Sequence, residues 1–567
     1  MSLLKFLFLL IIVSTLRIMG QGFGAMYRWL RDTKLFSLLV KLWHFLPQLP
    51  RKILKSLLKG GHSSPRFYHN LAINLLIGLA LTWLLLTFLN QYPLLTDPKD
   101  EGMDLAMQIR QNIIPPLGNN PPFVFLDIDD ETHQAWDEPL FTPRNHLKNL
   151  IAAAVKAEAR LIVVDIGLSQ TTPIEGLGFT AKLHPYDQQL SNYLANYVTD
   201  CEKKLDKTTC PPIILPRTFR ASLPKPPTDT GYLSIPPLPI PEERSSFLDQ
   251  VTAEPYVQWA STMFFRSPDY VIRRWWLWQP TCTAQQSVGV IPSVQLLAAA
   301  IIRNSTLQNT QEILPKALSR FKPEKCPGNY VPAQPEQIQI GNLTVSTDTH
   351  GIRQRIMYSM PWLVDNKPPP LPHSLYTEEN SEMPILTILS AQRYAESPPR
   401  ADLSALKNSI VVIGGSYADG RDIHLTPLGR MPGPLILINA IHSLLQYEEI
   451  ESVPLWQKLL LQALLIILIS VFSLMLTRSQ WVRQFIQWTI RRLGFVALFI
   501  FGIFAGAFSG AIVILLVLPF AVILLRYGIW LDFVIPLLIV QINQTMNDFN
   551  DLFDQCYNDA FKVTLKK

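Results

Sequence analysis

Residues 71–89 (LAINLLIGLALTWLLLTFL) contain no charged side chain, and this stretch restricts the fold more than any other part of the chain. A helix needs roughly 20 apolar residues to cross the hydrocarbon core of a bilayer. Charged residues make up 17% of the 567 residues, below the roughly 25% that is typical of soluble proteins. We therefore expect a transmembrane helix over residues 69–91.

The segment before this helix is basic. Residues 28–66 carry Lys and Arg side chains that are almost unopposed by acids. Because cytoplasmic flanks of membrane helices are rich in Lys and Arg, this side is expected to be cytoplasmic and the following residues external. Residues 1–68 also mix basic and apolar side chains at helical spacing, which predicts amphipathic helices on the inner membrane lipid. Residues 3–19 are apolar with two basic interruptions, and the sequence leaves open whether they span the membrane.

Three further transmembrane helices are predicted in residues 453–545. The first covers residues 455–476, and the arginine-rich loop after it is typical of the cytoplasmic side. Residues 493–525 are uncharged but too long for one ordinary helix, so an interpretation with four helices stays open. With three helices, residues 546–567 form a cytoplasmic tail; with four, they lie outside.

Four of the five cysteines, Cys201, Cys210, Cys282 and Cys326, fall in the segment expected outside the cytoplasm, whereas Cys556 lies in the predicted tail. An even number of cysteines in an oxidising compartment suggests two disulfides. The simplest pairing is Cys201–Cys210 with Cys282–Cys326, and the other two pairings stay open. A zinc site is the alternative, but no Cys-x-x-Cys or paired His spacing favours it.

Residues 92–452 are expected to form an extracytoplasmic α/β (α+β) domain. Residues 121–129 and 161–167 are short apolar runs typical of buried strands, and residues 144–158 have the periodicity of a helix. This order predicts a βαβ unit and hence a parallel sheet. Residues 408–416 predict another buried strand that ends in a glycine turn, with a helix after it.

The middle of this domain differs in composition. Its proline-rich stretches predict long surface insertions. Two β-hairpins are expected as additions to the core, one turning at Ser267–Asp269 and one turning at His350–Gly351. The basic and aromatic run at residues 273–278 is expected to be a packed, half-exposed strand rather than a ligand cage.

Five segments, in this order, carry a resemblance to a known family: FVFLDIDDET, TPRNHLKNLIAAAVKAEARLIVVDI, PDYVIRRWWL, DTHGIRQRIMY and IVVIGGSYADGRDIHLTP. The chain resembles the second CHASE family over residues 95–450. These are extracellular sensory domains found with bacterial adenylate cyclases, histidine kinases and serine/threonine kinases. The three predicted helices after the domain also look like that family's arrangement. The final helix of the domain keeps an asparagine, Asn439, but has Leu437 and Ile438 where a histidine and an alanine often stand.

The resemblance implies a sensor or receptor. Family members generally carry a cytoplasmic catalytic domain after the last membrane helix, whereas about two dozen residues follow residue 542 here. We therefore expect no enzymatic activity and a separate signalling partner. The alternative is a structural subunit of an envelope-spanning complex. Both hypotheses place the chain in a bacterial inner membrane, with its main domain in the periplasm.

The expected partners are membrane lipid and other membrane or envelope proteins, and a homo-oligomer is compatible with both hypotheses. The formal net charge is +6, and the basic residues cluster beside apolar segments, which favours membrane topology over nucleic-acid binding. No nucleic acid is therefore expected as a partner.

Polar side chains follow the predicted parallel strands at the edge where open α/β sheets bind their ligands. We take eight of them as candidate ligand-binding residues: Asp127, Asp129, Asp130, Arg144, Asp165, Asp422, His424 and Thr426.

Three interpretations of these residues compete. In the first, the acids cap helices, pair with Arg144 and order loops. In the second, Asp127, Asp129, Asp165 and Asp422 bind a ligand or a hard cation. In the third, the residues catalyse a reaction, although the sequence offers no clear nucleophile with a paired base. No cofactor is expected, because the glycines after the strand at residues 408–416 match neither a P-loop nor a GxGxxG fingerprint.

Overall fold

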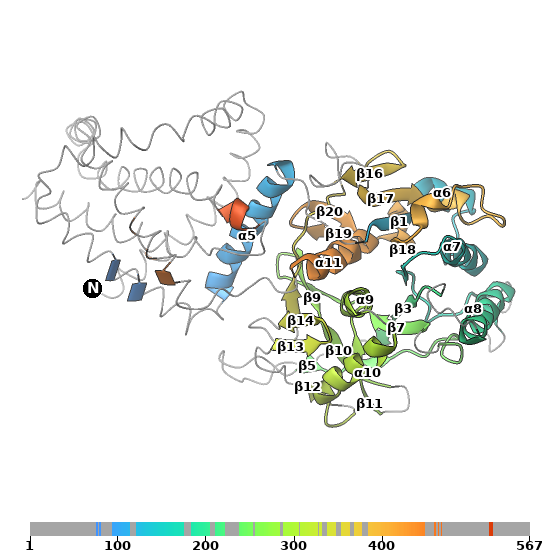
Figure 1. Ribbon diagram of the computed structural model, residues 1–567, viewed down its shortest axis with the longest axis horizontal. Coiled ribbons are helices and arrows are strands. Elements are labelled where there is room, and N and C mark those ends of the chain that lie inside the picture. Colours follow the sequence, from blue (N-terminus) through green and yellow to red (C-terminus); the bar gives the residue numbers. More distant parts are fainter. Residues whose placement is uncertain are drawn as a thin grey trace, which may run out of the picture. The chain divides into compact units, whose positions relative to one another are not determined.

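The computed structural model (Figure 1) describes short pieces at 75–76, 79–80, 459–460, 463, 467 and 521–525, and longer ranges at 93–113, 121–174, 183–203, 210–220, 238–252, 256–283, 287–304, 307–326, 328–330, 337–346, 353–362, 368–376 and 384–447. The predicted amphipathic segment, membrane helices and tail lie almost entirely outside these residues. Among the helices that are described, none combines the length and the apolar character needed to cross a membrane.

The chain divides into two compact units, one of which contains Met103–Leu455 and Leu515–Leu531. Its centre is a seven-stranded sheet in the order β16-β17-β1-β18-β2-β3-β7. The six strands from β17 to β7 are parallel, and only β16 at one edge is antiparallel. The strands are β1 (Phe123–Ile128), β2 (Leu161–Val164), β3 (Ile213–Arg217), β7 (Val257–Ser261), β16 (His373–Tyr376), β17 (Pro384–Ser390) and β18 (Ile410–Gly415).

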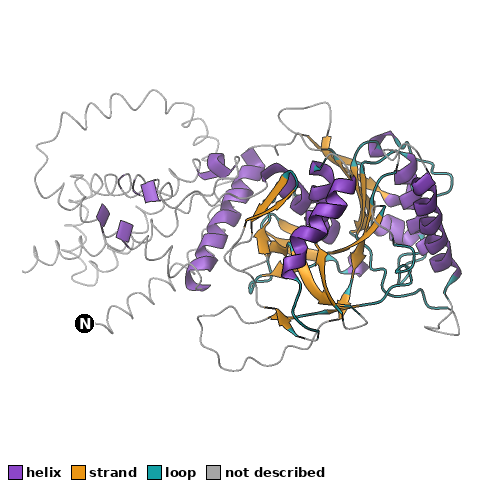
Figure 2. Ribbon diagram, turned by 60° about the horizontal axis from the view of Figure 1, so that its bottom comes forward, coloured by secondary structure: helices purple, strands orange, loops and turns teal. Residues whose placement is uncertain are grey.

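Helices cover both faces of this sheet (Figure 2). On one face, α7 (Arg144–Lys156) and α8 (Pro185–Lys203) share a buried core with side chains such as Leu126 of β1. On the other face, α11 (Gly433–Tyr447) packs on β1 and β18, and α9 (Val294–Arg303) packs on β3 and β7. A parallel sheet buried on both sides explains why its strands read as continuous apolar runs.

The predicted βαβ unit is confirmed, since β1, α7 and β2 form as expected and belong to one parallel sheet. The strand expected at residues 408–416 is β18, and it lies between β1 and β2. The helix expected after it is α11.

One predicted hairpin is confirmed and the other is wrong. Strands β8 (Phe264–Arg266) and β9 (Ile272–Trp276) pair across the turn at Ser267–Asp269. By contrast, β14 (Leu343–Ser346) pairs with β13 (Gln337–Ile340), whereas β15 (Arg353–Arg355) pairs with β9. The strands on either side of residues 347–352 thus belong to different sheets.

The remaining described elements surround this core. They are α5 (Pro93–Ile113), α6 (Asp130–Ala135), α10 (Leu307–Leu318), β4 (Phe219–Arg220), β5 (Leu238–Pro239), β6 (Glu242–Glu243), β10 (Trp278–Cys282), β11 (Val288–Pro292), β12 (Asn329–Tyr330), β19 (Ile423–Thr426), β20 (Gly429–Pro432) and four 3-10 turns, η4 (Ser319–Phe321), η5 (Ala391–Arg393), η6 (Ser404–Leu406) and η7 (Ala418–Gly420).

The two disulfides predicted as the simplest pairing are both present. Cys201–Cys210 joins the end of α8 to the residues before β3, with Cα atoms 5.9 Å apart. Cys282–Cys326 joins the end of β10 to the segment after η4, with Cα atoms 5.7 Å apart. Both separations are ordinary for a disulfide.

Candidate functional site

The carboxyl ends of β1, β18 and β2 lie side by side at the edge where open α/β sheets bind ligands. In the register of the sheet, Asp127 of β1 pairs with Gly414 of β18, and the amide of Asp165 donates to the carbonyl of Ile413. Helices α7, after β1, and α11, after β18, lie on opposite faces of the sheet. The sequence-predicted acids therefore do gather along one edge.

Asp127 is fully buried at the end of β1. Its carboxylate accepts two hydrogen bonds from Ser416, one from the amide (2.9 Å) and one from the hydroxyl (2.7 Å). Burial, reinforced by the charges of Asp129 and Asp130, raises the pKa of Asp127 to about 8 even though the Ser416 bonds act in the opposite direction. Asp127 thus holds the loop after β18 against the end of β1.

The next two acids also bond to backbone amides. Asp129 is the N-cap of α6 and accepts from the amide of Thr132 (2.8 Å). Asp130 accepts from the amide of Ala418 (2.8 Å) in the same loop that Asp127 holds. These bonds satisfy amides that would otherwise lack a partner.

The loop after β18 is pressed tightly against this edge by Tyr417. The Tyr417 ring stacks on His133 of α6, with ring centroids 4.2 Å apart. A Cβ atom at Gly415 would lie 2.6 Å from this ring, and one at Gly420 would lie 2.9 Å from it. Glycine is required at both positions because no side chain would fit beside the ring.

Asp165 and Asp422 form a second acidic group beside the start of α11. Burial, and then the nearby charge of Asp422, raise the pKa of Asp165 well above its ordinary value, although the side chain keeps some solvent contact. The Asp422 carboxylate packs so closely on Gly433, the first residue of α11, that a Cβ there would collide with it. His424 Nε2 lies 2.8 Å from Asp422 Oδ1.

Arg144 does not join these acids, contrary to the sequence-based hypothesis that it pairs with one of them. Its buried guanidinium donates from Nη2 to the carbonyl of Gly167 (2.8 Å), and its Nε lies 3.8 Å from Asp187 of α8. Asp187 in turn accepts from the amide and the hydroxyl of Thr172. The acid that neutralises Arg144 therefore comes from a helix that the sequence did not connect with it.

Thr426, the last of the predicted residues, closes a local turn. Its hydroxyl donates to the carbonyl of Gly429 (2.8 Å) and accepts from the amide of Leu428 (3.2 Å), between β19 and β20. Within the described part of the chain, no three His, Cys, Asp or Glu side chains are grouped so as to hold a metal ion.

Sequence reasoning missed Asp187, His133 and Tyr417 as parts of this edge. The available signal was the pair of glycines that ends β18, since glycine in a strand often marks a place where another group approaches the backbone closely. Asp187 carries no comparable local signal, because its role depends on where α8 lies.

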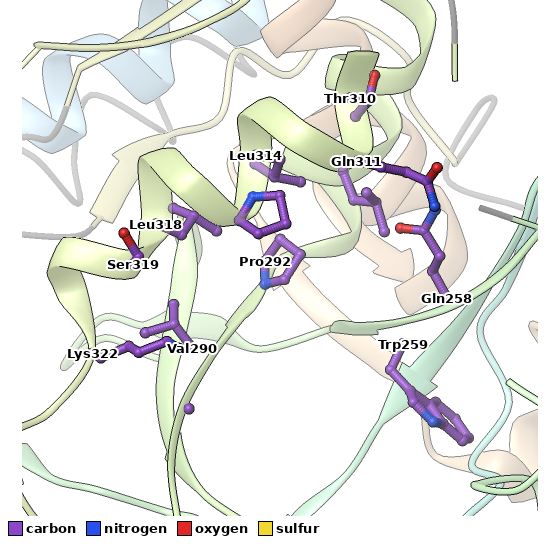
Figure 3. Close-up of a pocket in the computed structure, with 13 residues that line it drawn as sticks. Gln258, Trp259, Val290, Pro292, Thr310, Gln311, Leu314, Leu318, Ser319 and Lys322 are labelled. Atoms are coloured by element: carbon purple, nitrogen blue, oxygen red, sulfur yellow. The ribbon is translucent and has the colours of Figure 1, made fainter. Parts of the chain in front are cut away.

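A cavity of about 280 Å³ lies elsewhere, between β7, β11, α9 and α10 (Figure 3). Trp259, Pro292 and Leu314 contribute apolar surface, whereas Gln311 and Lys322 contribute polar groups. None of the eight sequence-predicted residues lines it.

Comparison with known proteins gives one family. No curated protein and no solved structure matches the chain. The family model of the CHASE2 domain matches residues 78–476, more than two thirds of the 567 residues. CHASE2 domains are sensory domains, and this chain belongs to the CHASE2 domain family.

Proposed function

We propose that this chain is a sensor of the bacterial inner membrane, whose CHASE2 domain detects a ligand or an envelope protein in the periplasm. The membrane helices then pass the change to a separate cytoplasmic partner protein, and no chemical reaction is assigned to the chain itself. The uncharged residues 71–89 and the basic segment before them support this topology. The two disulfides also favour an oxidising compartment.

The observation that carries the proposal is the direct bonding between α5 and α11. Helix α5 follows the first predicted membrane helix, and α11 precedes the next one. Arg110 of α5 donates to the hydroxyl of Tyr447 at the end of α11 (2.6 Å). Gln108 of α5 also donates to the carbonyl of Pro427 (2.8 Å), which lies in the turn between β19 and β20. A displacement of α11 would therefore be transmitted to α5, and so to the segments that precede and follow the domain.

A second contact ties α5 to the hairpin of β8 and β9. Asp104 of α5 accepts from Arg273 (2.8 Å) and from Arg355 (2.8 Å). Arg273 also binds Asp269 with two parallel bonds of 2.8 and 2.7 Å. Charge-assisted bonds of this kind are about twice as strong as neutral ones, so α5 is firmly joined to the domain.

Protease accessibility in intact cells tests the topology. A protease site placed in the proline-rich segment at residues 224–241 should be cut in spheroplasts, whereas a site at residues 60–61 should be cut only after the membrane is opened. Cleavage with the reverse pattern would overturn the proposal. Purification after gentle solubilisation then tests the partner, and a chain that is always recovered alone would count against a separate signalling protein.

The alternative is a scaffold subunit of an envelope-spanning complex. The observation that favours it is the occupied carboxyl edge of the sheet, where Asp127, Asp129 and Asp130 bond to the protein's own amides. Shortening the proline-rich segment should then release the partner while Tyr447→Phe leaves it bound. A sensor should instead keep its partner after the shortening, and in Tyr447→Phe the bound partner should no longer respond.

A further inference from the structure

The cavity of Figure 3 has walls of two kinds. Side chains of α10, among them Leu314 and Leu318, face Pro292 and Val290 of β11 across the cavity. At the edge strand β7, Trp259 adds an aromatic surface. These groups suit the apolar body of a small molecule.

The polar groups of the cavity favour a negatively charged ligand. Among the described residues that line it, Lys322 is the only charged one, and no carboxylate lines it. The Gln311 amide can donate as well as accept, and Figure 3 shows it directed toward Gln258. Ser319 gives its hydroxyl hydrogen to the carbonyl of Lys316 (2.8 Å), so its oxygen is left to accept a bond from a ligand.

The charges behind the wall are paired among themselves. Arg217 lies over the Trp259 ring, 5.0 Å from its centroid, and donates both to Glu243 (3.1 Å) and to Asp249. Because Arg217 holds both acids outside the lining, Lys322 is the charged side chain that a ligand meets in the cavity.

The cavity is also connected to α11. Leu297 of α9 lines it, and Thr310 of α10 donates to the carbonyl of Ala300 in α9. At the far end of α9, Arg303 donates to the carbonyl of Leu445 in α11. A ligand that moves α10 or α9 would therefore act on the helix that bonds to Arg110.

We propose that this cavity binds a small organic anion with an apolar body and one hydrogen-bond donor, and that α9 passes its binding to α11. The first part stands on the cavity alone, whereas the second part rests on the proposed sensor function. A volume of about 280 Å³ lies just below the roughly 300–1,000 Å³ of ordinary ligand pockets, so the ligand is smaller than a typical drug.

Ligand-observed NMR on the full chain in lipid nanodiscs tests the first part. The probes are 4-hydroxybenzoate, its neutral isostere 4-hydroxybenzamide, and phenyl phosphate as a second anion. We expect a dissociation constant of about 1 mM or lower for the carboxylate and about tenfold weaker binding of the amide. Tighter binding of phenyl phosphate would identify an organic phosphate as the anion. Equal binding of the amide, or no binding of either anion, would overturn the proposal.

Three variants locate the site. Lys322→Gln should weaken 4-hydroxybenzoate binding about tenfold, and Leu314→Trp should abolish it by filling the cavity. Lys316→Gln removes a charge from α10 outside the lining and should bind as wild type does. If Leu314→Trp proves unfolded, Gln311→Leu takes its place. This change replaces a polar lining side chain by an apolar one of similar size and should weaken binding. Wild-type affinity in Lys322→Gln and Gln311→Leu would show that the probe binds elsewhere.

Hydrogen exchange in α11 tests the second part. Saturating 4-hydroxybenzoate should change the exchange of residues 440–447 in wild type and leave it unchanged in Leu314→Trp. Binding without any change in α11 would keep the cavity as a ligand site but remove the proposed route of signalling.

Discussion

Nη2 of Arg110 donates a 2.6 Å hydrogen bond to the hydroxyl of Tyr447. The guanidinium also lies over the Tyr447 ring, 5.6 Å from its centroid. Since 337 residues separate the two in sequence, this contact joins the beginning of the CHASE2 domain to its end. The contact holds α5 and α11 together, and these two helices are next to the predicted membrane helices in the sequence.

Tyr447→Phe should weaken the contact between α5 and α11 without removing the ring. The change deletes one bond to a buried charged group, which typically contributes about 1.5–3 kcal/mol. Hydrogen exchange should speed up in residues 104–113 and 440–447 and stay unchanged in β1. Tyr394→Phe is the control, because it deletes a hydroxyl bond to the Asp402 carbonyl in another part of the domain. Equal effects of both variants on α5 would contradict the proposed link.

Asp104→Asn should destabilise the domain far more than the loss of a surface ion pair. Arg273 is 4% exposed, and the change leaves its guanidinium and that of Arg355 next to each other without their shared acid. Breaking a buried pair costs about 3–5 kcal/mol, and we expect the lower end of this range because Arg273 keeps its bonds to Asp269. Denaturant unfolding followed by tryptophan fluorescence measures the loss.

The matched control for that experiment is Glu158→Ala. Glu158 pairs with Lys407 at 3.4 Å, but both side chains are more than half exposed. Its removal should cost below about 1 kcal/mol. Similar losses in Asp104→Asn and Glu158→Ala would show that the buried network is not stabilising α5.

The sequence predicts those parts of the fold that depend on local patterns. The apolar runs around Phe125 and Val163 and the helix between them can be recognised because strands and helices have different hydrophobic periods. The order strand, helix, strand then indicates a parallel unit. The simplest cysteine pairing, in which each cysteine bonds to its neighbour along the sequence, is also confirmed.

Other features depend on packing between distant segments. The hairpin expected at His350–Gly351 is wrong because Arg353–Arg355 pairs with β9, where Arg355 also reaches Asp104. In the same way, Arg144 pairs with Asp187 because α7 and α8 lie together on one face. No local pattern around Arg144 contains this information.

Asn439→Ala should destabilise the packing of α11 against the segment after β15. Its side chain accepts from the amides of Ser359 and Met360 (both 2.9 Å) and donates to the Met360 carbonyl (2.9 Å), all fully buried. Each backbone group left without a partner costs about 1–3 kcal/mol, so we expect a loss of about 3 kcal/mol or more. Thermal unfolding of the full chain measures it.

Asn149→Ala provides the comparison for that loss. Asn149 is only half-buried and makes one bond, from its side-chain amide to the carbonyl of Ala395 (2.6 Å). Its removal should cost about 1 kcal/mol. If Asn439→Ala costs no more than Asn149→Ala, the buried amide of α11 does not hold residues 359–360 in place.

Asp127 should make the domain less stable as the pH rises. Burial raises its pKa to about 8 in the folded protein, whereas an unfolded aspartate has a pKa of about 3.9. Between these values the folded state binds more protons than the unfolded state, so the free energy of unfolding falls with increasing pH. The stabilising contribution is complete below about pH 4 and is lost as the pH passes about 8. Denaturant unfolding at several pH values between about 5 and 8 measures the slope, and Asp127→Asn should make it shallower.

Asp165 should contribute to the slope that remains in Asp127→Asn, because burial and the charge of Asp422 raise its pKa and its effect has the same sign. The double variant with Asp165→Asn should be flatter still. Asp402→Asn is the control, because hydrogen bonds from Ser404 lower the pKa of Asp402, and its contribution changes only at more acidic pH. A constant difference in unfolding free energy between wild type and Asp127→Asn from about pH 5 to 8 would mean that Asp127 is already ionised in the folded protein.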